Sequence, residues 1–193
     1  KNRIFYIEGN SHTANFIPLF NSLNIKDSIY FNHVTDPLIN INFELINNLT
    51  QSYDQVIYST NINTVQSLKR IELIKKKFNE KVKILILGPV PNLEKNINPL
   101  KCFIKNIECK YKKLNDFNSR NLGVLYEKLN QIIKRNKNIL FFNSYDSICS
   151  NDICIVFDKN KNLLTHRDKS HLTIEGSILM KNAFNDFYKK KIN

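Results

Sequence analysis

The segment Gly9-Asn10-Ser11-His12 has the residue types of a serine nucleophile held in a sharp turn. It follows an apolar run at residues 4–7 and precedes an amphipathic stretch at residues 13–23. This order predicts a strand, a turn and a helix, with the serine at the helix N-terminus. Backbone N–H groups there can stabilise an oxyanion, and the glycine leaves room for a substrate. The same residues also suit an ordinary helix cap, which the four residues alone favour.

A candidate base and its orienting carboxylate lie near the other end of the chain, at His171 and Asp168. A separation of three residues lets both share one turn, so the carboxylate can accept a hydrogen bond from one imidazole nitrogen. The other nitrogen can then act as a general base on a serine from a distant segment. With Ser11, this gives a triad in the chain order Ser, Asp, His. Taken alone, the pair favours capping or surface residues.

Together, the two segments resemble the SGNH (GDSL-like) hydrolase superfamily. More closely, they resemble its extracytoplasmic domains attached to acyltransferase-3 membrane proteins, which carry Gly-Asp-Ser-His early and Asp-x-x-His-Leu-Ser/Thr-x-x-Gly late. Here the motifs are Gly9-Asn10-Ser11-His12 and Asp168-x-x-His171-Leu172-Thr173-x-x-Gly176. The resemblance extends to Leu87-Gly88-Pro89-Val90-Pro91. It implies that Ser11 is the nucleophile, His171 the base and Asp168 the orienting residue.

The oxyanion hole departs from the superfamily pattern. The Ser11 N–H is one expected donor, and the superfamily adds a glycine after the second strand and an asparagine after the third. No glycine occurs between Gly9 and Gly88, so the glycine donor is missing in its usual form. For the asparagine, Asn61 is the first candidate and Asn63 the second, although both are equally consistent with ordinary loop residues.

Three further polar residues have lesser expected roles. Asn10 replaces the usual aspartate, which loses a charge and keeps an acceptor that stabilises the turn. His12 and His33 lack a neighbouring carboxylate in an orienting position, so we expect structural or substrate-adjacent roles for them. The sequence implies no metal site and no cofactor in this domain.

The length and composition favour one globular domain. The chain has 193 residues, of which 42% are hydrophobic, and no apolar run approaches the roughly 20 residues of a membrane span. We therefore expect a soluble chain that forms a single domain over residues 1–193. Because it begins at Lys1 without a signal peptide, we interpret it as a fragment of a larger membrane acyltransferase.

The chain is strongly basic, with a formal net charge of +12. Its lysine clusters could suit nucleic acid, an anionic membrane face or an acidic polysaccharide, but we favour solvated helix faces and a charged tail. No nucleic-acid motif or pattern of stacking aromatic residues accompanies the charge. We therefore expect no nucleic-acid partner.

Four cysteines fall into two local pairs, Cys102 with Cys109 and Cys149 with Cys154. These spacings differ from the short Cys-x-x-Cys hooks of zinc sites. If paired, each would close a short loop and contribute roughly 2–2.5 kcal/mol of stability. The alternative is four reduced thiols in a cytosolic protein. We favour two disulfides and an extracytoplasmic location, an interpretation that the resemblance supports.

Apolar runs alternate with amphipathic segments along most of the chain. The expected strands are residues 4–7, 28–32, 54–59, 82–87 and 138–142. The expected helices are residues 13–23, 37–49, 65–78, 120–134 and 173–188. Residues 91–118 are irregular, and residues 144–164 contain a possible small ribbon at 154–157.

This alternation predicts an α/β fold with a doubly wound, mainly parallel sheet. The resemblance implies a flavodoxin-like three-layer αβα sandwich with five strands in the order 2-1-3-4-5. In such sheets ligands bind beyond the carboxyl ends of the strands, where Ser11 follows the first strand. The loop of Asp168 and His171 enters the last helix and can reach the same edge.

The resemblance implies an O-acyltransferase that places an acyl group, expected to be acetyl, on a cell-surface polysaccharide. The attached membrane domain would supply the acyl group, and the domain would be monomeric, extracytoplasmic and tethered to the cytoplasmic membrane. One alternative is a free-standing carbohydrate or lipid esterase, which needs the same residues. Another is a catalytically silent glycan-binding module, which Asn10 and the missing glycine donor make plausible.

Overall fold

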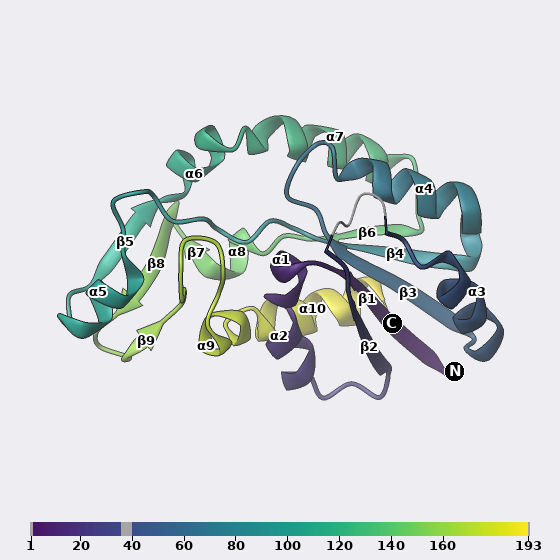
Figure 1. Ribbon diagram of the computed structural model, residues 1–193, viewed down its shortest axis with the longest axis horizontal. Coiled ribbons are helices and arrows are strands. Elements are labelled where there is room, and N and C mark those ends of the chain that lie inside the picture. Colours follow the sequence, from purple (N-terminus) through teal and green to yellow (C-terminus); the bar gives the residue numbers. More distant parts are fainter. Residues whose placement is uncertain (1, 36–39, 193) are drawn as a thin grey trace. The chain divides into compact units, whose positions relative to one another are not determined.

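The computed structural model describes residues 2–35 and 40–192, and the chain forms two compact units (Figure 1). The first unit comprises Lys1–Ala14, Asn24–Gly88 and Val124–Phe142, and the second comprises Asn15–Leu23, Pro89–Gly123 and Asn143–Asn193. Within the described residues, no helix has both the length and the apolar character that a bilayer crossing requires.

The first unit is built on a parallel five-stranded sheet in the order β2-β1-β3-β4-β6. Its strands are β1 (Arg3–Gly9), β2 (Ser28–His33), β3 (Gln55–Asn61), β4 (Val82–Leu87) and β6 (Ile139–Phe142). The central strands β1, β3 and β4 are buried along most of their length, as their apolar sequences require. The predicted α/β class, the parallel sheet and the strand order are confirmed.

Helices flank this sheet. They are α1 (Ser11–Ala14), α3 (Phe43–Ser52), α4 (Leu68–Phe78), η1 (Asn79–Lys81) and most of α7 (Leu122–Lys134). Figure 1 shows α4 and α7 side by side, and side chains of both helices line one cavity. On α7, the Tyr126 ring meets Phe141 of β6 edge to face, with ring centroids 5.5 Å apart.

The second unit contains a small antiparallel sheet that the sequence predicted only in part. Its strands are β5 (Cys109–Lys112), β7 (Cys149–Ser150), β8 (Ile153–Asp158) and β9 (Leu163–Leu164). They pair in the order β5-β8-β7, with β9 on β8. The ribbon expected at residues 154–157 is confirmed as β8, whereas β5 lies in the stretch expected to be irregular.

The helices of the second unit are short. They are α2 (Ile17–Ser22), α5 (Pro99–Ile104), α6 (Lys113–Ser119), α8 (Tyr145–Ile148), α9 (Ile174–Ile178) and α10 (Lys181–Lys191). Both predicted disulfides are present, Cys102–Cys109 and Cys149–Cys154. They lie beside a core cluster of Leu93, Tyr111, Cys154 and Val156.

Three predicted helices differ from the observed ones. The helix expected at 13–23 is interrupted, because Pro18 in the first turn of α2 would clash with the carbonyl four residues earlier. The helix expected at 173–188 breaks after α9, where the Met180 N–H donates to the Ser177 carbonyl in a tighter turn. The helix expected at 37–49 begins at Phe43, where the Asn42 side chain caps Leu45 N–H at 2.9 Å; residues 37–39 lie outside the described residues.

Candidate active site

Ser11 follows β1 at the carboxyl edge of the parallel sheet and is exposed. The turn before it is held by Asn10, whose Oδ1 accepts the His12 N–H at 3.0 Å and whose carbonyl accepts the Ala14 N–H at 3.0 Å. The turn-stabilising role expected of Asn10 is therefore confirmed. Gly9 is required here, because a Cβ at that position would overlap the Thr13 side chain.

Asp168 and His171 are paired as the sequence predicted. The His171 Nδ1 lies 2.9 Å from both carboxylate oxygens of Asp168. Oδ1 also accepts the backbone N–H groups of Ser170 and His171, each at 2.9 Å. Because a carboxylate only accepts, Nδ1 carries the proton, and Nε2 carries the lone pair that a general base needs.

The Asp168 carboxylate is held in its ionised form. Desolvation by burial raises its pKa, but the side chain is half exposed and this effect is outweighed. The hydrogen bonds from Ser170 and His171 favour the charged form and lower the Asp168 pKa below its usual value. Asp168 is therefore available at neutral pH to orient the imidazole and to stabilise its protonated form.

Asn15 fixes the backbone on both sides of His171, a role that the sequence did not reveal. Its Oδ1 accepts the Leu172 N–H at 2.9 Å, and its Nδ2 donates to the Ser170 carbonyl at 3.2 Å. The residue is buried, so these bonds are shielded from water. An isolated asparagine in an Asn-rich chain gives no signal of such a long-range contact.

His166 is a second buried anchor of the same loop. Its Nε2 lies 2.9 Å from the Pro91 carbonyl, and its Nδ1 lies 2.7 Å from Thr165 Oγ1. Since a carbonyl only accepts, Nε2 is the protonated nitrogen of a neutral ring. Desolvation by burial lowers the His166 pKa to about 4, against smaller opposing effects that include the Pro91 bond. His166 thus ties the mid-chain Pro91 segment to the residues that precede Asp168.

The rest of the late motif has structural roles. Thr173 caps α9, because its Oγ1 accepts the Gly176 N–H at 2.9 Å. Its own N–H donates to the Thr165 carbonyl at 3.0 Å. A Cβ on Gly176 would overlap that same carbonyl, so only glycine fits. These contacts fix how the loop of His171 enters the helix.

The two candidate oxyanion asparagines differ in their surroundings. The Asn61 Nδ2 donates to the carbonyls of Leu87 at 3.1 Å and Gly88 at 2.8 Å. Both amide hydrogens are thereby used to join the ends of β3 and β4. Asn63 is half-buried in the turn that precedes α4. The oxyanion role of either residue stays a prediction, although the Asn61 amide already donates to two carbonyls.

A buried polar network lies directly before the Ser11 turn. Glu8, the residue before Gly9, is fully buried and forms an ion pair with the equally buried Arg70 of α4. Its Oε1 accepts from Tyr6 Oη at 2.6 Å and Asn32 Nδ2 at 3.0 Å, and its Oε2 accepts from Tyr58 Oη at 3.0 Å. The network joins β1, β2, β3 and α4 beneath the end of β1.

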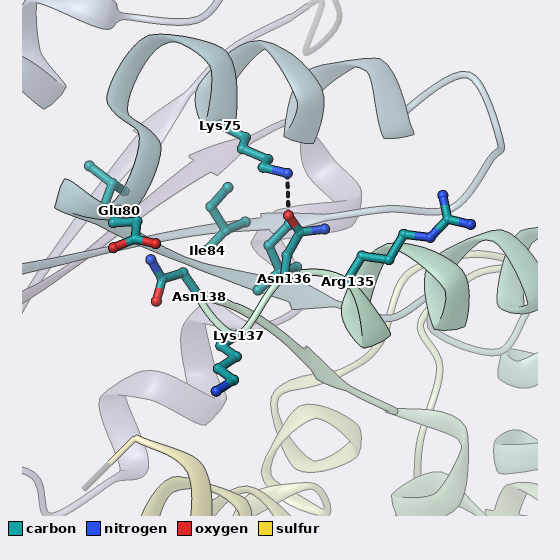
Figure 2. Close-up of a pocket in the computed structure, with 9 residues that line it drawn as sticks. Lys75, Glu80, Ile84, Arg135, Asn136, Lys137 and Asn138 are labelled. Atoms are coloured by element: carbon teal, nitrogen blue, oxygen red, sulfur yellow. Dashed lines mark hydrogen bonds between the residues drawn. The ribbon is translucent and has the colours of Figure 1, made fainter.

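His12 is half-buried in the Ser11 turn, and His33 is exposed at the end of β2. Their expected structural or substrate-adjacent roles stay predictions. A cavity of about 300 Å³ lies at the other edge of the sheet, beside the first residues of β4 and β6. Its basic side chains point in different directions, with Lys75 turned toward Asn136 and Lys137 turned away (Figure 2). We therefore assign no site there.

The structure brings Asp168 and His171 together within the second unit. Ser11 and both candidate oxyanion asparagines belong to the first unit. The meeting of Ser11 with His171 stays a prediction.

Comparisons with known proteins identify one family. A family model described as "SGNH domain (fused to AT3 domains)" matches residues 2–186. A solved structure titled "The structure of a putative platelet activating factor from Streptococcus pneumonia" matches with a TM-score of 0.54. It is 13% identical, and the match covers 97% of this chain and 84% of that chain. This likeness shows the fold alone. No curated protein matches the chain in sequence.

Proposed function

Because the chain belongs to the family of SGNH domains fused to AT3 domains, we propose that it is a serine-dependent O-acyltransferase domain. It moves an acyl group, acetyl in this proposal, to a hydroxyl of a cell-surface polysaccharide. The attached AT3 domain supplies the acyl group. The single observation that carries the proposal is the Asp168–His171 pair, in which both carboxylate oxygens lie 2.9 Å from Nδ1.

The reaction proceeds in two steps. His171 Nε2 takes the Ser11 proton as Ser11 Oγ attacks the acyl carbonyl, and the donor's leaving group departs with that proton. Asp168 stabilises the imidazolium that forms between these events. The acceptor hydroxyl then gives its proton to His171 and attacks the acyl-enzyme. Ser11 leaves as the free hydroxyl, which restores the starting state.

Two features support Ser11 as the nucleophile. It is exposed at the carboxyl edge of a parallel sheet, where ligands bind in such folds. It also lies four residues before Asn15 in the sequence, so one short segment carries both the proposed nucleophile and the clamp of the His171 loop. The Ser11 N–H and Asn63 are the proposed oxyanion donors.

Two disulfides support an extracytoplasmic location, since such bonds persist in oxidising compartments. We propose that the domain acts there, tethered through its AT3 partner. No metal or cofactor takes part in the proposed reaction.

The test is turnover of p-nitrophenyl acetate with and without added oligosaccharides. We expect release of nitrophenol by the wild type, its loss in Ser11→Ala, and acetylated oligosaccharide detected by mass spectrometry. Ser28→Ala is the matched control, because Ser28 is exposed at the start of β2 in the same unit. Nitrophenol release that persists in Ser11→Ala would contradict the proposal. Nitrophenol release by the wild type without acetylation of any oligosaccharide would indicate an esterase.

A further inference from the structure

A group of exposed apolar side chains lies on α5 and just after its end in the second unit. Leu100 is 57% exposed, Phe103 42%, Ile104 71% and Ile107 54%. Soluble domains expose single apolar residues commonly, but clusters of them mark interaction surfaces. We call these four residues the α5 patch.

The backbone beneath the α5 patch is firmly held, so its exposure is a fixed feature of the fold. Cys102 is buried and bonded to Cys109. The Ile107 N–H closes the turn onto the Cys102 carbonyl at 3.0 Å, and the Asn98 side chain caps the Lys101 N–H at 2.9 Å. The Phe103 ring also meets the buried Phe157 of β8 edge to face, with centroids 5.6 Å apart.

The α5 patch is set among positive charges. Residues 95–113 contain six lysines and one acidic residue, Glu108, which pairs with Lys110. Lys101 and Lys105 are exposed within the patch itself. With Lys110 and Ile107 they line an open hollow of about 390 Å³.

From this combination we propose that the α5 patch docks on the surface of an anionic lipid bilayer. Aliphatic and aromatic side chains gain by entering the boundary between headgroups and acyl chains, while neighbouring lysines pair with anionic headgroups. A polysaccharide would match the lysines but would leave the four apolar side chains in water. None of the residues of the α5 patch belongs to the proposed triad.

Vesicle co-sedimentation of the full chain tests this inference. The vesicles contain phosphatidylcholine alone or with about one third phosphatidylglycerol. We expect binding only to the anionic vesicles and weaker binding at high salt. Lys101→Gln with Lys105→Gln should weaken the partition coefficient about 25-fold, since each lysine near such a surface is worth about fivefold. Ile104→Ser with Ile107→Ser should weaken it at least about tenfold.

Matched controls come from the first unit. Lys76→Gln with Lys77→Gln removes two exposed lysines of α4, and Leu73→Ser removes a side chain that is 44% exposed. Both controls, and Ser11→Ala, should bind as the wild type does. Equal binding to neutral vesicles, no binding to either kind, or equal effects of patch and control variants would each overturn the inference. A wild-type dimer that Ile104→Ser with Ile107→Ser converts to monomer would also overturn it and assign the patch to a second copy.

Discussion

At the scale of single residues, we expect Asp168 to matter more for the tautomer of His171 than for the stability of the loop. Asp168→Asn keeps an oxygen for the N–H groups of Ser170 and His171, and the side chain is 51% exposed. The fold should therefore persist. Ester turnover should fall about 10⁴-fold, as in the corresponding serine-protease change, because the amide favours the wrong tautomer.

Turnover assays combined with thermal melts check this prediction, with the exposed Asp186→Asn of α10 as the control. Ester turnover by the double variant Ser11→Ala with Asp168→Asn should be little lower than turnover by Ser11→Ala alone, because the residues act as one unit. Activity within about tenfold of the wild type, together with a lower melting temperature, would make Asp168 a structural residue.

The two asparagines after β3 should separate in the same assays. Asn63→Ala should lower kcat by about 10²–10³-fold with little change in stability, as expected on losing an oxyanion donor. Asn61→Ala should instead lower the free energy of unfolding by about 1–3 kcal/mol, because it removes the amide that donates to the carbonyls of Leu87 and Gly88. The opposite pattern would exchange the two roles.

At the scale of the elements, the network around Glu8 braces the strand that carries the Ser11 turn. Glu8→Gln leaves the buried Arg70 without a countercharge and should lower the free energy of unfolding by about 3–5 kcal/mol. Adding Arg70→Met should recover part of that loss, because no unpaired charge then remains buried. Urea unfolding measures both variants, and equal stability of the single and double variants would argue against a coupled pair.

The His166 anchor should make the second unit sensitive to acid. Its pKa is about 4 in the folded chain and about 6.5 when unfolded, so the unfolded state binds the proton more readily. Stability is fully present above about pH 6.5 and is lost as the pH falls toward 4. At about pH 7.5 the free energy of unfolding of the wild type should exceed that of His166→Gln. Roughly 2–3 kcal/mol of this difference should be lost by about pH 4.5. Unfolding curves at both values check this, and a constant difference would show that His166 does not titrate.

The sequence predicts an element correctly where the local pattern of apolar residues determines the structure. The apolar runs of β1, β3 and β4 are long enough to identify buried parallel strands. The strand β5 was missed because Cys109–Lys112 is lysine-rich and acquires its pairing only from β8, more than 40 residues later. Local periodicity carries no information about such a partner.

The candidate site likewise combines contacts that follow from sequence spacing with contacts that only the folded structure reveals. Asp168 and His171 share one turn, so their contact follows from sequence spacing. Asn15 and His166 act through partners far along the chain, Leu172 and Pro91, and only the folded structure reveals them. The commitment of the Asn61 amide to two carbonyls is likewise a tertiary feature.

At the scale of the whole molecule, the proposed triad takes Ser11 from the first unit and its base and carboxylate from the second. The family match spans both units, from residue 2 to residue 186. We therefore propose that His171 of the second unit activates Ser11 of the first, and a reaction that marks Ser11 directly tests this activation.

That measurement is covalent labelling with a fluorophosphonate, followed by mass spectrometry of the peptide that contains Ser11. Ser11 Oγ attacks phosphorus, His171 takes the proton and fluoride leaves. We expect one adduct, on Ser11, and a labelling rate at least about a hundredfold lower in His171→Ala, with Ser28→Ala unchanged. An unlabelled Ser11, or labelling at the wild-type rate in His171→Ala, would contradict the account.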